Sequence, residues 1–226
     1  MESSALLNQM LERHSISEYL PYLAYNKDAD CYILETGVGI IYECSPIQFP
    51  DTSHKDTLRS LFESPRRPGT SIQFLMYASR YIDTYLDAYV LSRQNITGNS
   101  IYADSAEQRK ILYSKGAEKP IVRGNNVKIR NFRLFVSMVI PCEKTPRGYK
   151  KCIDENIDKY RESLRQTLFS LHMAPKTVEP EDLNRILMEV LNPGHDIKES
   201  SYDTTVPIRS QVVYSDTEVF IEPNYL

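Results

Sequence analysis

The chain has 226 residues, of which 41% are hydrophobic and 25% are charged, and its formal net charge is -3. This composition is typical of an ordinary soluble protein, and the small negative charge provides no overall attraction to nucleic acid or to an anionic membrane. No segment approaches the roughly 18 consecutive apolar residues of a membrane-spanning helix, and the N-terminus lacks the features of a signal peptide. We therefore expect a cytosolic protein with a core of its own.

The four cysteines do not suggest a disulfide scaffold or a zinc site. They are unevenly spaced and include no Cys-x-x-Cys pair. We predict reduced, mostly buried thiols at Cys31, Cys44, Cys142 and Cys152.

The N-terminal part of the chain predicts a helix followed by a hairpin. Residues 4–14 carry leucine and methionine at helical spacing, and Leu20-Pro21 then indicates a linker-like entry into the main body. Residues 31–35 and 38–44 are rich in β-branched and aromatic types and are separated by Thr36-Gly37. This arrangement predicts a β-hairpin.

The central part predicts alternating helices and strands. A helix is expected to begin near Ser53 and to end before Pro65, and a compact buried strand is expected over 71–78. Apolar and tyrosine side chains recur every three to four residues over 81–90, which predicts a helix whose stripe packs in the core, while an exposed subset of its tyrosines could still anchor a protein interface. A second helical stretch follows around 104–115.

The C-terminal part contains the longest strand pattern and the clearest helix. Apolar residues alternate along 127–140, as in a half-buried strand, and form a continuous helical stripe along 152–173. Another helix is expected to begin at Pro180. A final hairpin is predicted from 208–213 and 218–221. Because hairpins are frequent, we predict an α+β fold with a mixed, largely antiparallel sheet and several packed helices.

No motif for nucleotide hydrolysis or covalent catalysis is present. A phosphate-binding loop needs a Gly-Lys pair, and none occurs in the sequence; a Gly-x-Ser-x-Gly nucleophile elbow is also missing. The histidines are His14, His54, His172 and His195, and none has ligand spacing. We therefore predict no catalytic, metal-binding or cofactor-binding residue, although a site assembled from scattered His, Asp and Glu remains a third hypothesis.

A basic turn offers an alternative to a purely protein-binding role. Lys144, Arg147, Lys150 and Lys151 lie between the long strand and the long helix, where they could contact phosphate. Solvated charges in a turn are the ordinary interpretation, because no glycine-rich or aromatic platform accompanies them. A nucleic-acid-binding module that uses the turn 144–151 stays open as the alternative function.

Six blocks of sequence, taken in order and spacing, point to a known family. They are Leu20-Pro-Tyr22 with Tyr25, Val38–Glu43 with Pro46-Ile47, Gly69–Ser79, Phe132–Pro141, Leu191-Asn-Pro193 and Arg209-Ser-Gln211. Together they resemble the TraC-type ATPases of F-like conjugative type IV secretion systems, in the region before the motor domain. The resemblance covers nearly the whole chain.

The resemblance implies a parent ATPase that uses ATP and magnesium in a motor domain with Walker motifs. This chain lacks those motifs, so we expect it to have no enzymatic activity and no cofactor of its own. We predict an N-terminal helical segment at 1–19 and a single α+β domain at 20–226. An excised N-terminal domain explains the missing motor better than a natural short protein does, and both stay open.

The resemblance also implies docking to inner-membrane components of a secretion complex and assembly with other copies of the ATPase, in pilus assembly and DNA transfer. The chain would then be cytoplasmic and peripheral at the inner face of the bacterial inner membrane, held there by protein contacts. Interface candidates are Tyr22, Tyr25, Leu7, Met10 and Leu11, because tyrosine and exposed apolar side chains favour protein interfaces.

Overall fold

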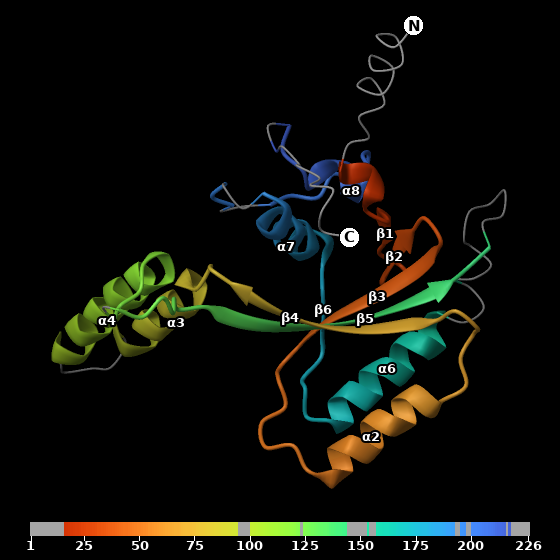
Figure 1. Ribbon diagram of the computed structural model, residues 1–226, viewed down its shortest axis with the longest axis horizontal. Helices are drawn as coiled ribbons and strands as arrows, with labels where there is room; N and C mark the ends of the chain where they lie inside the picture. The colour runs from red at the N-terminus through yellow and green to blue at the C-terminus, as the bar shows by residue number, and fades with distance from the viewer. Residues whose placement is uncertain are drawn as a thin grey trace, which may run out of the picture. The chain divides into compact units, whose positions relative to one another are not determined.

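The computed structural model describes residues 16–94, 100–122, 124–143, 153, 157–192, 195–197, 200–215 and 217. Within these residues the chain forms a six-stranded, mostly antiparallel sheet with packed helices (Figure 1). The strand order is β1-β2-β3-β5-β4, and the short strand β6 also pairs with β3. The predicted α+β class is confirmed.

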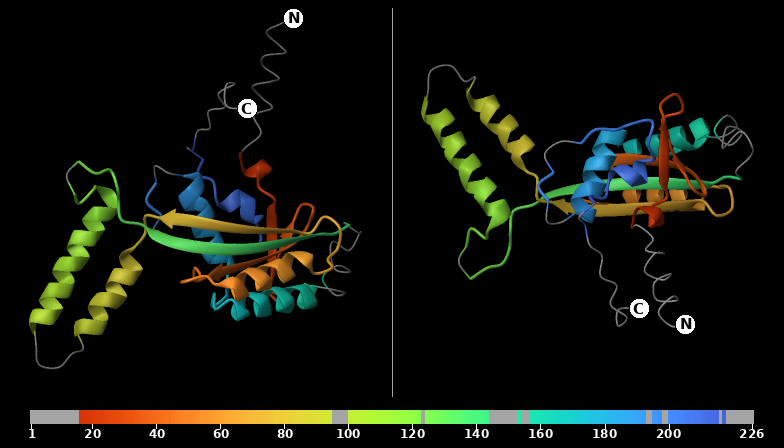
Figure 2. Two further views of the ribbon diagram at one scale, coloured as in Figure 1. Left: turned by 60° about the horizontal axis from the view of Figure 1, so that its bottom comes forward. Right: turned by 90° about the horizontal axis from the view of Figure 1, so that it is seen from above.

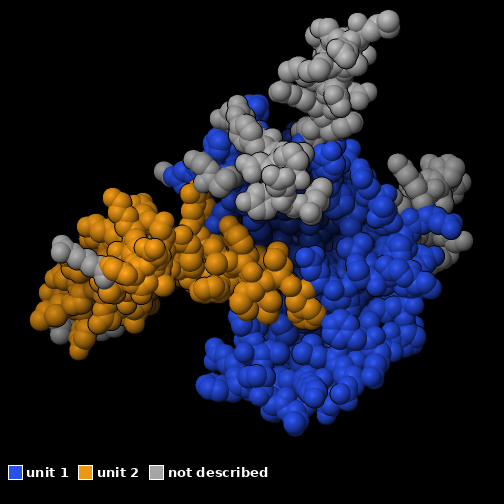
Figure 3. All heavy atoms as spheres, in the orientation of Figure 1, with its two compact units in different colours: residues 1–73, 136–226 blue, residues 74–135 orange. Residues whose placement is uncertain are grey.

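The chain divides into two compact units (Figure 3). Unit 1 comprises residues 1–73 and 136–226, and unit 2 comprises residues 74–135. The boundary falls within two strands, β4 (Ser71–Ser79) and β5 (Asn131–Pro141). The domain limits expected from the sequence stay a prediction.

Strand β3 (Gly37–Cys44) lies at the centre of unit 1, and seven of its eight residues are buried. It pairs antiparallel with β2 (Cys31–Leu34), which confirms the predicted hairpin, and its second half pairs with β6 (Lys176–Thr177). Aliphatic side chains on both faces exclude water from these ladders. Burial on both faces explains why the β3 sequence is apolar without alternation.

Strand β1 (Tyr22–Asn26) corrects the expectation of a linker after Leu20-Pro21. Its residues pair antiparallel with β2, from Tyr22 opposite Leu34 to Asn26 opposite Cys31. A five-residue strand with no buried residue carries little hydrophobic signal of its own. Its pairing with β2 therefore decides its conformation.

Helices cover both faces of the unit 1 sheet. Figures 1 and 2 show α2 (Thr52–Glu63) and α6 (Asp158–Ser170) side by side on one face, with α7 (Pro180–Leu191) and α8 (Ile208–Gln211) on the other. The helices predicted after Ser53, within 152–173 and from Pro180 are confirmed. A short 3₁₀ helix, η1 (Ile16–Tyr19), precedes β1.

Local sequence explains where α2 begins, but it misled us at α8. The Asp51 carboxylate accepts a hydrogen bond from the His54 backbone N–H at 3.0 Å, which caps α2.

The predicted strand over 208–213 is wrong, because Ile208 begins a helical turn and is fully buried. The Gln211 side chain donates to the carbonyl oxygens of Asp203 and Val206, at 2.8 Å and 2.7 Å, and holds this turn closed. Residues 218–221 lie outside the described residues.

Unit 2 contains a helical hairpin of α3 (Asp83–Gln94) and α4 (Ser100–Glu118), which confirms both predicted helices. The strand β4 is also present, but the expectation that it is buried is wrong. Six of its nine residues are exposed and only Ser79 is buried. As the terminal strand, β4 has a described neighbour on one side alone.

The cysteines differ from the expectation of uniformly reduced thiols. Cys31 and Cys44 are free and buried, and burial raises the pKa of their thiols to about 11 and about 12. Cys142, in contrast, is disulfide-bonded. Spacing along the chain could not reveal this bond, because it depends on which sulfur atoms meet in space. Cys152 lies outside the described residues.

A close approach of two strands makes Gly37 sensitive to substitution. An alanine Cβ at this position would lie 2.1 Å from the Ile140 carbonyl oxygen and 3.0 Å from the Pro141 Cα. Because these atoms belong to the β5 backbone, we expect Gly37→Ala to lower the free energy of unfolding of unit 1 by about 3 kcal/mol, the upper end for overpacking.

Gly39→Ala is the matched control for this prediction, to be compared by urea denaturation. Its added Cβ would meet only the end of the Leu34 side chain, at 3.1 Å. That side chain can shift, so the cost should stay below roughly 1 kcal/mol. Equal costs for the two alanine variants would contradict the proposed backbone clash.

Candidate functional site

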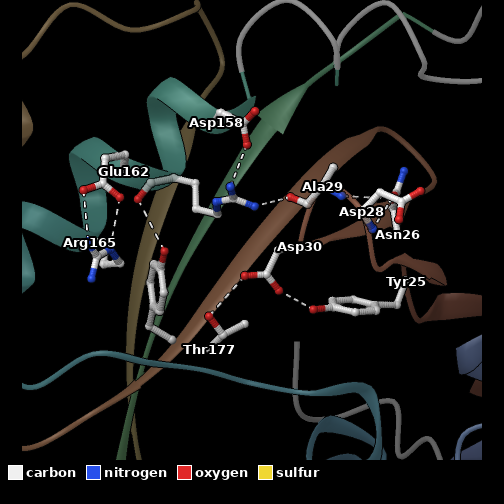
Figure 4. A network of polar contacts seen from close by, with 11 residues as sticks. Tyr25, Asn26, Asp28, Ala29, Asp30, Asp158, Glu162, Arg165 and Thr177 are labelled. Atoms are coloured by element: carbon white, nitrogen blue, oxygen red, sulfur yellow. Dashed lines mark hydrogen bonds and ion pairs between the residues drawn. The ribbon is translucent and has the colours of Figure 1, made fainter.

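The turn between β1 and β2 is the first candidate, because polar side chains converge on it (Figure 4). The Asn26 side-chain oxygen accepts from the backbone N–H groups of Asp28 and Ala29, at 3.0 Å and 3.1 Å. This places Asp30 in the left-handed region, with φ of 51°. The Asp30 carboxylate accepts a short hydrogen bond from the Tyr25 hydroxyl and one of 3.3 Å from the Thr177 hydroxyl. The turn is therefore held against β6.

Arg161 on α6 connects the same turn to the helix layer. Its guanidinium donates to the Ala29 carbonyl oxygen at 2.6 Å and to the Asp158 carboxylate at 2.7 Å. The Tyr42 hydroxyl donates in turn to the Arg161 carbonyl oxygen at 3.4 Å. Two regions that are far apart in the sequence meet here: the β1–β2 turn with β3, and α6 with β6.

An open hollow of about 560 Å³ lies over this network. It is lined by both signs of charge: Lys27, Arg161 and Arg165 are the cations, and Asp28, Asp30, Glu162 and Glu179 are the carboxylates. The Arg161 guanidinium forms an ion pair with the Asp158 carboxylate at 2.7 Å. The Arg165 guanidinium donates to both carboxylate oxygens of Glu162, at 3.0 Å and 3.1 Å.

The chemistry of the hollow favours a structural role. The two arginines already have carboxylate partners within the chain. Among the described residues, no group of three or more His, Cys, Asp or Glu is placed to hold a metal ion. We interpret the network as a polar clamp that fixes the β1–β2 turn to α6 and β6.

Three tyrosines in and beside the clamp have raised pKa values. Burial, together with the hydrogen bond to Asp30, holds the pKa of Tyr25 far above its ordinary value. Burial alone is the main cause for Tyr32 and Tyr42, and it raises the pKa of Tyr42 to about 12. These hydroxyls therefore stay protonated and serve as hydrogen-bond donors in the folded chain.

The tyrosines proposed from the sequence as interface residues lie close together and make internal contacts. The rings of Tyr22 and Tyr25 pack against the Tyr32 ring, with centroid distances of 6.4 Å and 5.0 Å. Both side chains are half-buried. A contact with a partner through them stays a prediction.

The other sequence-predicted site residues cannot be placed. Leu7, Met10, Leu11, Lys144, Arg147, Lys150 and Lys151 all lie outside the described residues. The N-terminal interface and the basic turn therefore stay predictions.

The helical hairpin of unit 2 is the second candidate, and polar groups join its two helices. The Lys110 ammonium lies 2.7 Å from the Asp87 carboxylate, and the Ser114 hydroxyl donates to Asp83 at 2.9 Å. Val90 and Ala106 are the fully buried apolar residues of the two helices. The hairpin thus has a small apolar interior.

The outer faces of this hairpin are unusually apolar. Seven large side chains are exposed along the two helices, and three of them are aromatic. This set, called here the hairpin surface, comprises Tyr85, Leu91, Ile101, Tyr102, Ile111, Leu112 and Tyr113. Large exposed apolar side chains mark protein interfaces, and aromatic residues are enriched there.

Sequence reasoning did not identify the hairpin surface, because it favoured the core for the tyrosine stripe over 81–90 and left an exposed subset only as an open alternative. Part of that stripe does pack inward: Ile82 and Val90 are buried, whereas Tyr85 is 61% exposed. A usable signal was present in α4. Its inner positions include Ala103, Ala106 and Ser114, which are too small or polar to build a core.

A family model described as TraC protein matches residues 16–226 of the chain. The chain belongs to the TraC family. The resemblance inferred from the six sequence blocks is therefore confirmed. Protein TraC of Escherichia coli (strain K12) is 22% identical to this chain over 234 residues. That alignment covers 100% of this chain and 26% of the relative, so the chain spans about a quarter of that protein's length.

No solved structure matches this TraC-family chain. Within the part of the chain that the structure describes, no helix is both long enough and apolar enough to cross a membrane.

Alkaline pH should destabilise the TraC-family chain through its buried tyrosines. Tyr32 is 1% exposed, and its hydroxyl donates to the Val178 carbonyl oxygen at 2.7 Å. Its pKa is raised in the folded state, whereas an unfolded tyrosine titrates near about 10. Above that pH the unfolded chain binds fewer protons than the folded chain, so the free energy of unfolding falls as pH rises.

Tyr32→Phe tests this assignment. The variant should lose roughly 1–2 kcal/mol at neutral pH, because the Val178 carbonyl oxygen loses its donor. Above pH 10 the free energy of unfolding of the variant should fall less steeply with pH than that of the chain without substitutions, by up to about 1.4 kcal/mol per pH unit. Denaturant titrations from pH 7 to pH 11 would measure both, and Tyr85→Phe, on an exposed ring, is the control. Parallel curves for the parent and Tyr32→Phe would contradict the assignment.

Proposed function

We propose that this chain is a non-catalytic docking and assembly domain of a TraC-type ATPase. In this proposal the parent protein acts in a conjugative type IV secretion system, where it serves pilus assembly and DNA transfer, and this chain is the part that precedes its motor domain. Family membership supports the setting. The sequence contains no Gly-Lys pair from which a phosphate loop could be built, and this supports a binding role.

One observation carries the proposal: the apolar surface of the chain is concentrated in unit 2. Of the twenty large hydrophobic residues that are exposed among the described residues, fourteen lie within residues 74–135. Burying such groups against a partner contributes about 25 cal/mol per Å² of apolar area removed from water. A protein partner would therefore gain substantial affinity at this unit.

The partner we propose is an inner-membrane component of the secretion complex that presents an apolar helical segment. The hairpin surface offers aliphatic and aromatic side chains on α3 and α4, which suit ridges-into-grooves packing of a further helix. The surface also carries three exposed tyrosines, whose hydroxyl groups can form hydrogen bonds with water or with the partner: Tyr85, Tyr102 and Tyr113. Docking of this kind would hold the chain at the inner face of the bacterial inner membrane.

Charge placed on the hairpin surface should abolish this docking. We expect this chain without substitutions, called here the parent chain, to co-sediment with membranes from cells that contain the secretion components. The double variant Leu112→Lys with Tyr113→Lys should co-sediment at least about tenfold less, since two buried ammonium groups would replace two apolar anchors. Both positions are exposed, so the fold should persist, and circular dichroism would verify it.

Gln108→Lys is the matched control, because it adds a lysine at an exposed, polar position of the same helix. It should co-sediment like the parent chain. Equal sedimentation of the double variant would contradict docking through this surface. Sedimentation of the parent chain with membranes that lack the secretion components would contradict a protein partner.

The purified chain is expected neither to bind nor to hydrolyse ATP. Isothermal titration and a phosphate-release assay with magnesium would measure this, with a buffer blank as control. Turnover that disappears on substitution of one internal residue would contradict the non-catalytic assignment.

A further inference from the structure

Strand β4 is the terminal strand of the sheet order, and its apolar side chains are exposed on both faces. Leu75 and Met76 are consecutive and therefore point to opposite faces, yet they are 46% and 57% exposed. Phe132 on the neighbouring strand β5 is also exposed. Among the residues that the structure describes, none covers either face of β4 as fully as the faces of β3 are covered.

The opposite end of the sheet is protected. Helix α8 packs on β1, and the Tyr25 backbone N–H donates to the Tyr202 hydroxyl oxygen at 3.1 Å. An irregular register between Tyr22 and Ala24 further disturbs that strand. Proteins blunt open sheet edges with such covers and bulges, or with charged residues and proline. The nine residues of β4, Ser-Ile-Gln-Phe-Leu-Met-Tyr-Ala-Ser, include no charged residue and no proline.

We propose that β4 pairs antiparallel with β4 of a second copy of this chain, about a two-fold axis at Leu75. This inference deepens the assembly part of the proposed function and rests on it, but it uses a surface other than the hairpin surface. Around the axis Leu75 faces its own copy, and Phe74 faces Met76 of the second copy. Each sheet would continue into the other through the main-chain hydrogen bonds of an added strand.

The sequence of β4 favours its own copy as the occupant. In a symmetric antiparallel pair, the residue n positions before Leu75 faces the residue n positions after it. This register sets Ser71 opposite Ser79, Ile72 opposite Ala78, Gln73 opposite Tyr77, and Phe74 opposite Met76. Serine thus meets serine at the two ends, Gln73 faces the amphipathic Tyr77, and Ile72 faces Ala78. The Met76 thioether faces the Phe74 ring, which is a favourable contact.

Complementary charges at the axis test the pairing and its register. The parent chain should sediment as a dimer in analytical ultracentrifugation. Leu75→Lys and Leu75→Glu should each weaken the dimer on the order of tenfold or more, because like charges would face each other. An equimolar mixture of the two variants should recover dimers, since Lys then faces Glu. Leu91→Lys, at an exposed position of α3, is the matched control and should remain dimeric.

Thiol cross-linking provides an independent check of the register. Leu75→Cys should give covalent dimers with a short bifunctional thiol reagent, because opposed Cβ atoms lie about 5 Å apart. Ser71→Cys should not, since the two copies of that residue would be eight positions, or about 26 Å, apart. The parent chain reports the background, and the free thiols among its described residues, Cys31 and Cys44, are buried.

A monomeric parent chain, or a Leu75→Lys variant that still dimerises, would overturn the inference. Failure of the Lys and Glu variants to pair when mixed, or cross-linking through Ser71→Cys, would overturn the register. Co-sedimentation with membranes tests docking independently of dimerisation. If the Leu75→Lys chain is monomeric but still co-sediments, docking does not require the β4 pairing. The Leu112→Lys, Tyr113→Lys variant should still dimerise even though it no longer docks to membranes. This result would show that dimerisation does not depend on the hairpin surface.

Discussion

Burial of β3 on both faces is the constraint on which the rest of unit 1 depends. A strand placed between two helix layers must be apolar throughout, and it must satisfy its backbone groups through its neighbours. β2 and β6 pair with successive parts of β3, and β5 approaches so closely that Gly37 has no room for a side chain. The helix pairs α2 with α6 and α7 with α8 then exclude water from the two faces.

The polar clamp stabilises the β1–β2 turn, whose backbone conformation is unfavourable without support. The β1–β2 turn reverses the chain beside α6, and Asp30 adopts a left-handed backbone conformation there. Such a residue is costly unless its surroundings hold it. Tyr25, Thr177 and Arg161 provide that support through the Asp30 carboxylate and the Ala29 carbonyl oxygen. The side chains of Asp30, Arg161 and Arg165 at the hollow are therefore engaged in contacts within the chain.

Unit 2 follows the opposite rule, because much of its apolar surface faces outward. Its helices are joined by an ion pair and hydrogen bonds, and aliphatic and aromatic side chains occupy their outer faces. An isolated soluble protein rarely keeps such a surface, since its exposure to water is unfavourable. The exposed apolar side chains of unit 2 are the observation on which the proposed docking role rests.

The sequence by itself determined the TraC family, the α+β class and most elements, because apolar periodicity, Pro180 and the Thr36-Gly37 turn act locally. Tertiary structure alone decided that β1 is a strand, that α8 is a helix and that β4 is exposed. Alternation along a strand shows which residues share a face, but not whether another element covers that face. The same limit hid the polar clamp, in which Tyr25 and Asp30 contact a distant part of the chain that contains Arg161 and Thr177. For the same reason, periodicity could not decide which tyrosines of α3 are exposed.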